Sequence, residues 1–172
     1  MACARDGLDG ITAARSEHVF LGIDERGAAS IVKTNGNPAV HLILRGGKTG
    51  PNYGAESVAN AKRLIVENGL EPFLVVDCSH DNSGKDHRMQ SVVFRDLLEQ
   101  RVSGNSGVVG LMLESHLREG RQTLGEDPST LRHGVSITDA CVGWEETEEL
   151  KRLAELSHPR VVVDTAGLIP AA

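Results

Sequence analysis

The sequence predicts a parallel α/β fold, in which strands and helices alternate along the chain. Three short segments are apolar and lack the polar alternation of a half-exposed strand, which is typical of strands covered on both faces. These segments are residues 40–44, 72–76 and 107–113. Segments with helical periodicity follow them, at residues 55–68, 86–101 and 144–156. Three strand–helix cycles in succession indicate an α/β architecture.

The composition excludes several classes of protein. The chain has 172 residues, of which 40% are hydrophobic and 24% charged, as in a globular domain with a buried core. A formal net charge of −6 provides no basic surface, so we expect no nucleic-acid partner. No apolar run reaches the roughly 20 residues of a membrane span, and the first residues do not resemble a signal peptide. Cys3, Cys78 and Cys141 form no paired framework, so we expect a reduced, cytoplasmic protein.

A hairpin is predicted before the first β/α unit. Its strands cover residues 18–23 and 28–34, with a turn-like segment between them. After the strand at 40–44 and a loop rich in Gly, Pro and Asn, the first helix covers residues 55–68. Gly69 provides its C-terminal stop. The apolar stripe of this helix consists of Val58, Ala61, Leu64 and Ile65.

The second and third units repeat the pattern. The strand at 72–76 precedes a helix at 86–101, and the strand at 107–113 leads into a polar loop at 118–134. The last helix covers residues 144–156. The inward face of the helix at 86–101 is predicted to carry Met89, Val92, Val93 and Leu97.

Reactive side chains follow each of the three apolar strands. Arg45 follows the first, His80 the second and Glu114 the third, while Asp139 precedes the last helix. Functional groups of parallel α/β folds gather at the carboxyl ends of the strands, so we expect these residues to converge. One His with two carboxylates is a ligand set for a divalent transition metal.

Each of these residues also has a commoner role. A single His at a strand end is more often a hydrogen-bonded structural residue than a ligand. Glu114 and Asp139 could cap helices or lie solvated in loops, and Arg45 could form a surface ion pair worth at most about 1 kcal/mol. The separations of 34 residues from His80 to Glu114 and 25 from Glu114 to Asp139 form no motif. Spacing alone leaves both interpretations open.

A Ser-His-Asp hydrolase site is a further alternative, because Ser79, His80 and Asp77 lie close together in the sequence. Neighbouring residues of a strand point to opposite faces, so Ser79 and His80 are not expected to share a proton. We therefore set this interpretation aside.

Four segments around these residues resemble class I 3-deoxy-D-arabino-heptulosonate 7-phosphate (DAHP) synthases. They are HLILRGGKTGPNY, VVDCSHDNSGK, GLMLESHLREGRQ and SITDACVGWEET, and they occur in the family's order within residues 18–156. The resemblance implies a (β/α)8 barrel, called a TIM barrel. It also implies a transferase that condenses phosphoenolpyruvate with erythrose 4-phosphate in the shikimate pathway of aromatic amino acid biosynthesis.

The resemblance also assigns a metal site. It implies that His80, Glu114 and Asp139 bind a divalent metal, for which Mn, Fe, Co or Zn are suitable. The metal would polarise the aldehyde oxygen or activate water. The family's fourth ligand is a Cys in a G-P-C-S segment of the first barrel strand, and this sequence contains no such segment.

The resemblance implies one part of a phosphoenolpyruvate site. Arg45 resembles an arginine that holds the phosphate of this substrate, which suits its planar guanidinium. Gly46 and Gly47 form a supporting loop, whose backbone can approach the ligand closely. The K-P-R-T segment for erythrose 4-phosphate, the G-A-R arginine and most of the F-K-N-G-T-D-G segment are absent from the sequence.

The alignment indicates the C-terminal portion of a barrel, with strands six to eight, their helices and a hairpin inserted before strand six. Residues 1–17 would be a remnant of the preceding barrel helix, 18–156 a C-terminal partial barrel, and 157–172 an unassigned tail. The 172 residues are fewer than the about 250 of a typical closed barrel.

A partial barrel exposes sheet edges and apolar faces. We therefore expect a homo-oligomer, or pairing with a chain that carries barrel strands one to five. The isolated chain is expected to be inactive. The alternative is a non-catalytic remnant of such an enzyme that binds a metal or a partner.

Overall fold

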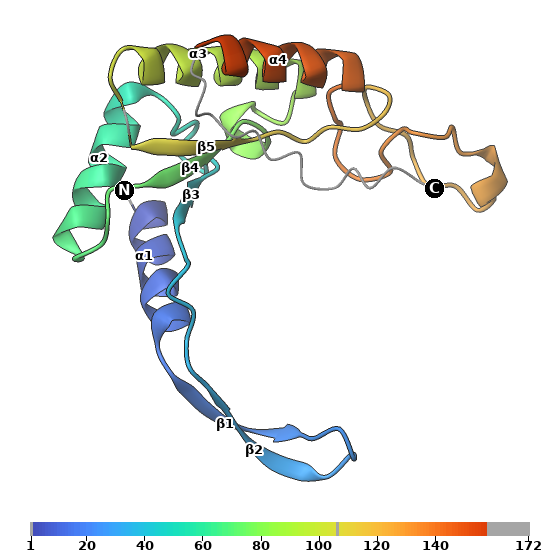
Figure 1. The fold of residues 1–172 in the computed structure, drawn as a ribbon. Helices are drawn as coiled ribbons and strands as arrows, with labels where there is room; N and C mark the ends of the chain where they lie inside the picture. Colours follow the sequence, from blue (N-terminus) through green and yellow to red (C-terminus); the bar gives the residue numbers. More distant parts are fainter. Residues whose placement is uncertain (1, 106, 158–172) are drawn as a thin grey trace. The chain divides into compact units, whose positions relative to one another are not determined.

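The computed structural model describes residues 2–105 and 107–157 (Figure 1). The chain divides into two compact units, with the boundary between Leu42 and Ile43. Except for its first residue, the tail predicted at 157–172 lies outside the described residues. None of the described helices is long and apolar enough to cross a membrane.

The first unit contains a helix and a two-stranded hairpin. The helix is α1 (Ala2–Arg15), and the strands are β1 (His18–Ile23) and β2 (Ala29–Thr34). The strands pair antiparallel along their full length, which confirms the predicted hairpin. Asp24 stabilises the turn between them, because its Oδ1 accepts a hydrogen bond from the backbone N–H of Ala28 at 2.9 Å.

The second unit is built around a three-stranded sheet in the order β3-β4-β5. The strands are β3 (Leu42–Leu44), β4 (Leu74–Asp77) and β5 (Val108–Met112), and β4 pairs with β5 in parallel. Each strand is shorter than its predicted segment. No strand extends more than one residue beyond the predicted bounds. In the described part of the chain, β3 and β5 form the two edges of this sheet. The predicted α/β class is thus confirmed.

Three helices accompany this sheet. They are α2 (Ala55–Glu67), α3 (Gln90–Val102) and α4 (Trp144–Ser157). α2 buries all four apolar residues of its predicted stripe. α3 and α4 pack together (Figure 1), and Arg95 of α3 forms an ion pair with Glu149 of α4 at 2.9 Å.

The inward face of α3 differs from the prediction. Met89 and Val92 were expected to be buried but are 41% and 49% exposed. The buried residues of α3 are Gln90, Val93, Phe94, Leu97 and Leu98. The buried stripe includes a polar residue, Gln90, because its side-chain amide is hydrogen bonded to the backbone of Glu114. A pattern that counts only apolar residues therefore assigns Met89 and Val92 to the buried face, where the structure has Gln90 and Phe94.

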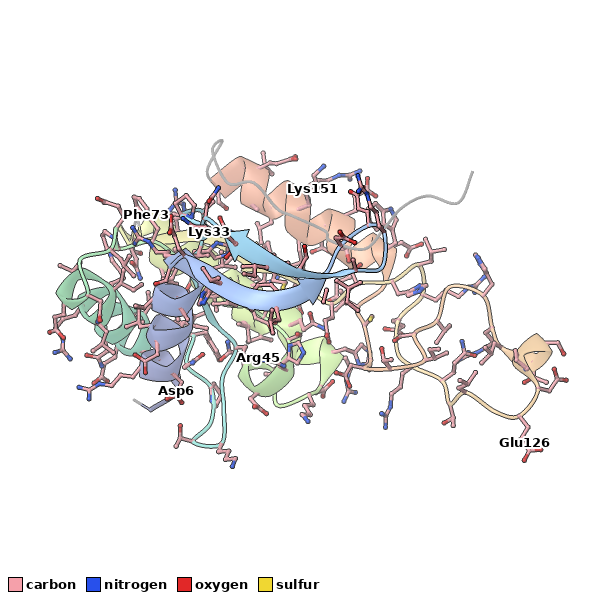
Figure 2. The ribbon with its side chains drawn as sticks, turned by 90° about the horizontal axis from the view of Figure 1, so that it is seen from below. Asp6, Lys33, Arg45, Phe73, Glu126 and Lys151 are labelled. Atoms are coloured by element: carbon pink, nitrogen blue, oxygen red, sulfur yellow. The ribbon has the colours of Figure 1, made fainter. Side chains whose placement is uncertain are left out.

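The segment between β5 and α4 is a long loop with internal hydrogen bonds. Its only regular element among the described residues is a 3-10 turn, Pro128–Thr130. Gln122 holds the base of the loop, because its Nε2 donates to the carbonyl oxygens of Arg132 at 2.8 Å and Val135 at 2.9 Å. Figure 2 shows Glu126 at the far end of this loop.

Candidate metal centre

His80 follows β4 through a sharp change in backbone direction. β4 ends at Asp77, and His80 begins a short 3-10 turn (His80–Asn82) with a φ of 49°. A left-handed conformation at a residue other than glycine costs of order 1–3 kcal/mol, so neighbouring contacts have to hold it. The His80 carbonyl oxygen accepts hydrogen bonds from the backbone N–H of Lys85 at 2.8 Å and from Ser83 Oγ at 3.1 Å.

The side chains of Ser79 and His80 meet, which corrects the expectation from strand alternation. Ser79 Oγ lies 2.7 Å from His80 Nδ1, because His80 belongs to the turn and not to the strand. Asp77 Oδ2 lies 2.6 Å from the same nitrogen. In a hydrolytic triad the serine and the carboxylate contact opposite nitrogens of the imidazole. Here both contact Nδ1, so the arrangement orients the ring and does not activate a nucleophile.

Glu114 lies two residues beyond the end of β5. Gln90 of α3 holds its backbone: the Glu114 N–H donates to Gln90 Oε1 at 2.9 Å, and Gln90 Nε2 donates to the Glu114 carbonyl oxygen at 3.3 Å. Glu114 Oε1 lies 3.4 Å from His80 Nε2. Partial burial raises the pKa of the Glu114 carboxyl, an effect that positive charge on His80 opposes and negative charge on Asp139 and Asp77 increases.

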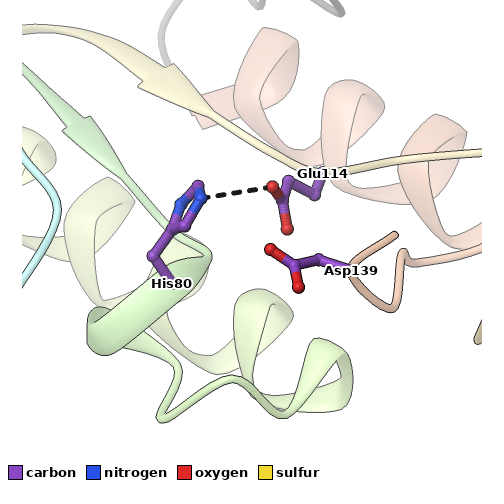
Figure 3. Close-up of side chains that lie close together, drawn as sticks. All are labelled: His80, Glu114 and Asp139. Carbon is purple, nitrogen blue, oxygen red and sulfur yellow. Dashed lines mark ion pairs between the residues drawn. The ribbon is translucent and has the colours of Figure 1, made fainter.

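Asp139 is exposed and lies in the segment that leads to α4. Backbone hydrogen bonds hold this segment beside β5, since Val142 N–H donates to the Glu114 carbonyl oxygen at 3.0 Å. One ligand atom from each of His80, Glu114 and Asp139 lies within 4.8 Å of the other two. Figure 3 shows the three side chains directed toward a common space. The three residues predicted as metal ligands therefore form one cluster.

The donor atoms of this cluster fit a divalent transition metal. One imidazole nitrogen and two carboxylate oxygens form a mixed N/O ligand set, and three protein ligands leave a coordination position for water or substrate. The carboxylates of Glu114 and Asp139 repel each other when both are ionised. A bound cation would remove this repulsion.

The Arg45 side chain is exposed, and it is not among the residues of the cluster. Arg45 directly follows β3, and Gly46 then adopts a φ of 75°. A Cβ at Gly46 would lie 2.7 Å from the backbone nitrogen of Asn82 and from the carbonyl carbon of Asp81. The loop can therefore approach the His80 turn only with glycine here. Gly47 closes the next turn through hydrogen bonds with Gly50 at 2.8 and 3.2 Å.

Asn82 links the Arg45 loop to the turn that carries His80 of the candidate metal site. Its Nδ2 donates to the carbonyl oxygens of Leu44 at 3.1 Å and Asp77 at 2.8 Å, and its Oδ1 accepts from the backbone N–H of Asn52 at 2.8 Å. Asn52 Oδ1 in turn accepts from the Gly46 N–H at 2.8 Å. The ends of β3 and β4 are thus joined through one buried amide.

Sequence reasoning missed Asp77, Asn82 and Gln90 as supporting residues of the cluster. All three are at most 3% exposed and all act through hydrogen bonds. A polar residue on the apolar face of a predicted helix, such as Gln90, is a signal that could have been followed. Cys78 is fully buried, which raises the pKa of its thiol, and no cysteine belongs to the cluster among the described residues.

Comparison with known proteins identifies the family. The model of the DAHP synthetase I family matches residues 6–152. The chain belongs to the DAHP synthetase I family. The resemblance to class I DAHP synthases is therefore confirmed, and it extends over most of the chain.

Curated members of the DAHP synthetase I family are similar over most of the chain. This chain is 45% identical over 141 residues to a putative phospho-2-dehydro-3-deoxyheptonate aldolase of Schizosaccharomyces pombe. The aligned region covers 81% of this chain and 38% of that protein. The chain is 43% identical to the Tyr-sensitive phospho-2-dehydro-3-deoxyheptonate aldolase of Escherichia coli, covering 84% of this chain and 40% of the relative. The chain thus spans about two fifths of the length of these relatives.

A solved structure shows the same fold. The phospho-2-dehydro-3-deoxyheptonate aldolase of Francisella tularensis matches with a TM-score of 0.84 and 33% identity. The match covers 92% of this chain and 46% of that structure. The mixed α/β fold described above is therefore that of a member of the family.

Proposed function

We propose that this chain is the carboxyl-terminal part of a DAHP synthase, which condenses phosphoenolpyruvate with erythrose 4-phosphate. The observation that carries the proposal is the cluster of His80, Glu114 and Asp139 in a chain of this family. We assign β3, β4 and β5 to strands six to eight of a (β/α)8 barrel. Residues 18–156 would form this partial barrel, preceded by a helix remnant at 1–17 and followed by the unassigned residues 157–172.

The cluster would hold the divalent metal of the enzyme, Mn, Fe, Co or Zn. When bound, this metal supplies a Lewis acid for the aldehyde oxygen of erythrose 4-phosphate or for water. The chain's own contribution is orientation. His80 is held by its Nδ1 contacts, and Glu114 is held by the backbone hydrogen bonds of Gln90. Both groups are thus fixed before a ligand arrives, which lowers the cost of binding.

Arg45 would bind the phosphate of phosphoenolpyruvate. Its exposed guanidinium presents a planar set of N–H donors that matches a phosphate group in a bidentate geometry. The loop after it would bring backbone N–H groups near the same phosphate, since Gly46 has no Cβ to block the approach.

The 172-residue chain would be inactive alone. It contains no G-P-C-S segment for a fourth metal ligand and no K-P-R-T segment for erythrose 4-phosphate. Positioning of both substrates supplies a large part of such a rate, so loss of half the groups abolishes it. The missing groups would come from a chain that carries barrel strands one to five. The exposed sheet edges and apolar faces of a partial barrel also favour a homo-oligomer of this chain, which would not supply those groups. A cluster of three metal-ligand candidates without the second substrate site also suits a non-catalytic remnant that binds a metal or a partner.

The test is reconstitution. The full chain is assayed with Mn²⁺ and both substrates, alone and mixed with the amino-terminal part of a class I DAHP synthase, and erythrose 4-phosphate-dependent release of phosphate is measured. We expect turnover only in the mixture. His80→Ala should abolish it, whereas His133→Ala should not, because His133 is exposed and outside the cluster.

Two results would contradict the proposal. Turnover by the chain alone would disprove its dependence on a second part. No turnover in any mixture, with metal binding intact, would identify the chain as the non-catalytic remnant.

A further inference from the structure

Asp77 is a buried carboxylate that the proposed reaction does not use. It is the last residue of β4 and is 1% exposed. In the described part of the chain it pairs with no lysine or arginine. A buried carboxylate without such a partner is costly unless its oxygens accept hydrogen bonds from other groups.

Both carboxylate oxygens of Asp77 contact Ser79 or His80, at the start of the turn that follows β4. Oδ1 accepts hydrogen bonds from the Ser79 backbone N–H at 2.8 Å and from Ser79 Oγ at 2.7 Å. Oδ2 lies 2.6 Å from His80 Nδ1. The Asp77 carbonyl oxygen also accepts from Asn82 Nδ2 at 2.8 Å, so the backbone that carries the carboxylate is held as well.

This geometry determines which nitrogen of His80 faces the cluster. A carboxylate only accepts hydrogen bonds, so His80 Nδ1 carries the hydrogen in the contact with Asp77. In the neutral imidazole the lone pair then lies on Nε2. Nε2 is the nitrogen that faces Glu114, at 3.4 Å from Oε1.

We propose that Asp77 is a positioning residue that holds His80 as the Nδ1–H tautomer and directs the Nε2 lone pair toward the space shared with Glu114 and Asp139. This inference rests on the proposed metal function. It adds Asp77 as the residue that determines the orientation of the candidate metal ligand His80. Carboxylates that accept from the second nitrogen of a metal-binding His orient the ring and increase its basicity, and their loss typically weakens metal binding 10- to 100-fold.

The contact also accounts for the backbone of His80. A φ of 49° is rarely adopted by residues with a side chain. Asp77 Oδ2 accepts from His80 Nδ1, and Ser79 Oγ lies 2.7 Å from the same nitrogen, so these contacts hold the ring relative to the turn. Asp77 therefore acts on the direction of the ring as well as on its tautomer.

The test uses the full chain labelled with ¹⁵N-histidine. Long-range ¹H–¹⁵N spectra report which ring nitrogen carries the hydrogen, and they are recorded at about pH 8.5, well above the ordinary imidazole pKa of about 6.5. Co²⁺ titration followed by visible absorbance then gives the metal affinity. The variants are Asp77→Asn and the matched control Asp81→Asn, since Asp81 is the next acid along the chain and its carboxylate is not among the hydrogen-bond or ion-pair partners of the His80 ring.

We expect wild-type His80 to be the Nδ1–H tautomer. Asp77→Asn should lose this preference and bind Co²⁺ 10- to 100-fold more weakly, and Asp81→Asn should match the wild type in both measurements. An Nε2–H tautomer in the wild-type chain would overturn the inference without any variant, even if Asp77→Asn fails to fold. Unchanged Co²⁺ affinity in folded Asp77→Asn would also overturn it. Absence of Co²⁺ binding in the wild-type chain would instead contradict the proposed metal function.

Discussion

Asn82, in the turn after β4, donates its side-chain amide to the carbonyl oxygen of Leu44, the last residue of β3, at 3.1 Å. This hydrogen bond joins the strand that precedes Arg45 to the turn that contains His80. The two candidate binding groups, Arg45 and His80, follow different strands, and their relative position depends on this buried amide. Asn82 is 3% exposed, so water does not replace its contacts.

Replacement of Asn82 by alanine is expected to destabilise the chain. Two buried carbonyl groups and one partly buried N–H lose their partner, and each unsatisfied buried group costs of order 1–3 kcal/mol. We expect a loss of at least about 2 kcal/mol in urea unfolding. Asn60→Ala is the matched control, because its amide makes one long contact at the surface of α2. An Asn82→Ala variant as stable as Asn60→Ala would contradict the role of this residue.

Gly46→Ala should disturb the Arg45 loop. The new Cβ would lie 2.7 Å from backbone atoms of Asp81 and Asn82, and alanine is strained at a φ of 75°. We expect a loss of stability of about 1–3 kcal/mol and weaker binding of inorganic phosphate in calorimetry. Gly54→Ala is the control, because nothing lies near its Cβ position and its φ is −60°. Equal effects of the two substitutions would show that the close approach at Gly46 is not required.

The raised pKa of Glu114 predicts how the stability of the metal-free chain depends on pH. The folded state binds a proton that the unfolded state releases at pH values between the ordinary Glu pKa of about 4.3 and the raised one. Stability contributed by this group therefore falls as the pH rises through that window, because the ionised form is the one that burial and the neighbouring Asp139 disfavour. Glu114→Gln should remove this dependence.

The measurement for this prediction is urea unfolding of the metal-free wild type and Glu114→Gln at several pH values. The variant should be the more stable of the two at neutral pH, and the difference should vanish below about pH 4. A variant that is less stable at neutral pH would contradict the cause given for the pKa shift.

The hairpin predicts self-association of the isolated chain. Leu21 and Ile31 lie opposite each other in the register of β1 and β2, and they are 82% and 74% exposed. Exposed apolar patches of this kind promote contacts between molecules. We expect concentration-dependent association in sedimentation velocity, which the double variant Leu21→Lys with Ile31→Lys should reduce without loss of stability. A wild-type chain that sediments as a monomer at all concentrations would disprove this expectation.

Turn chemistry and apolar periodicity correctly predicted the elements that are stabilised mainly by residues close together in the sequence. The hairpin around Asp24 and the buried stripe of α2 were predicted because turn chemistry and apolar periodicity act over a few residues. The approach of His80, Glu114 and Asp139 was predicted by the rule that strand ends meet at one edge. These features required no knowledge of long-range hydrogen bonds.

The features that the sequence did not predict depend on side-chain hydrogen bonds, long-range ones in α3 and local ones in the turn at His80. The buried face of α3 was misplaced because Gln90 is buried through its contacts with Glu114, 24 residues away. The contact between Ser79 and His80 was excluded by strand alternation, which no longer applies once His80 adopts a φ of 49°. Neither feature can be read from apolar periodicity, since both are set by polar groups that find partners only in the folded chain.

We propose that His80, Glu114 and Asp139 bind one divalent metal. Asp139→Asn tests it most directly, because Asp139 is exposed and its side chain makes no hydrogen bond within the described residues, so its loss leaves the fold intact. Calorimetric titration of the full chain with Mn²⁺ should show a single site that Asp139→Asn weakens at least about tenfold, while Glu126→Gln, at the far end of the same loop, leaves it unchanged. Equal Mn²⁺ affinity of the wild type and Asp139→Asn would contradict the claim.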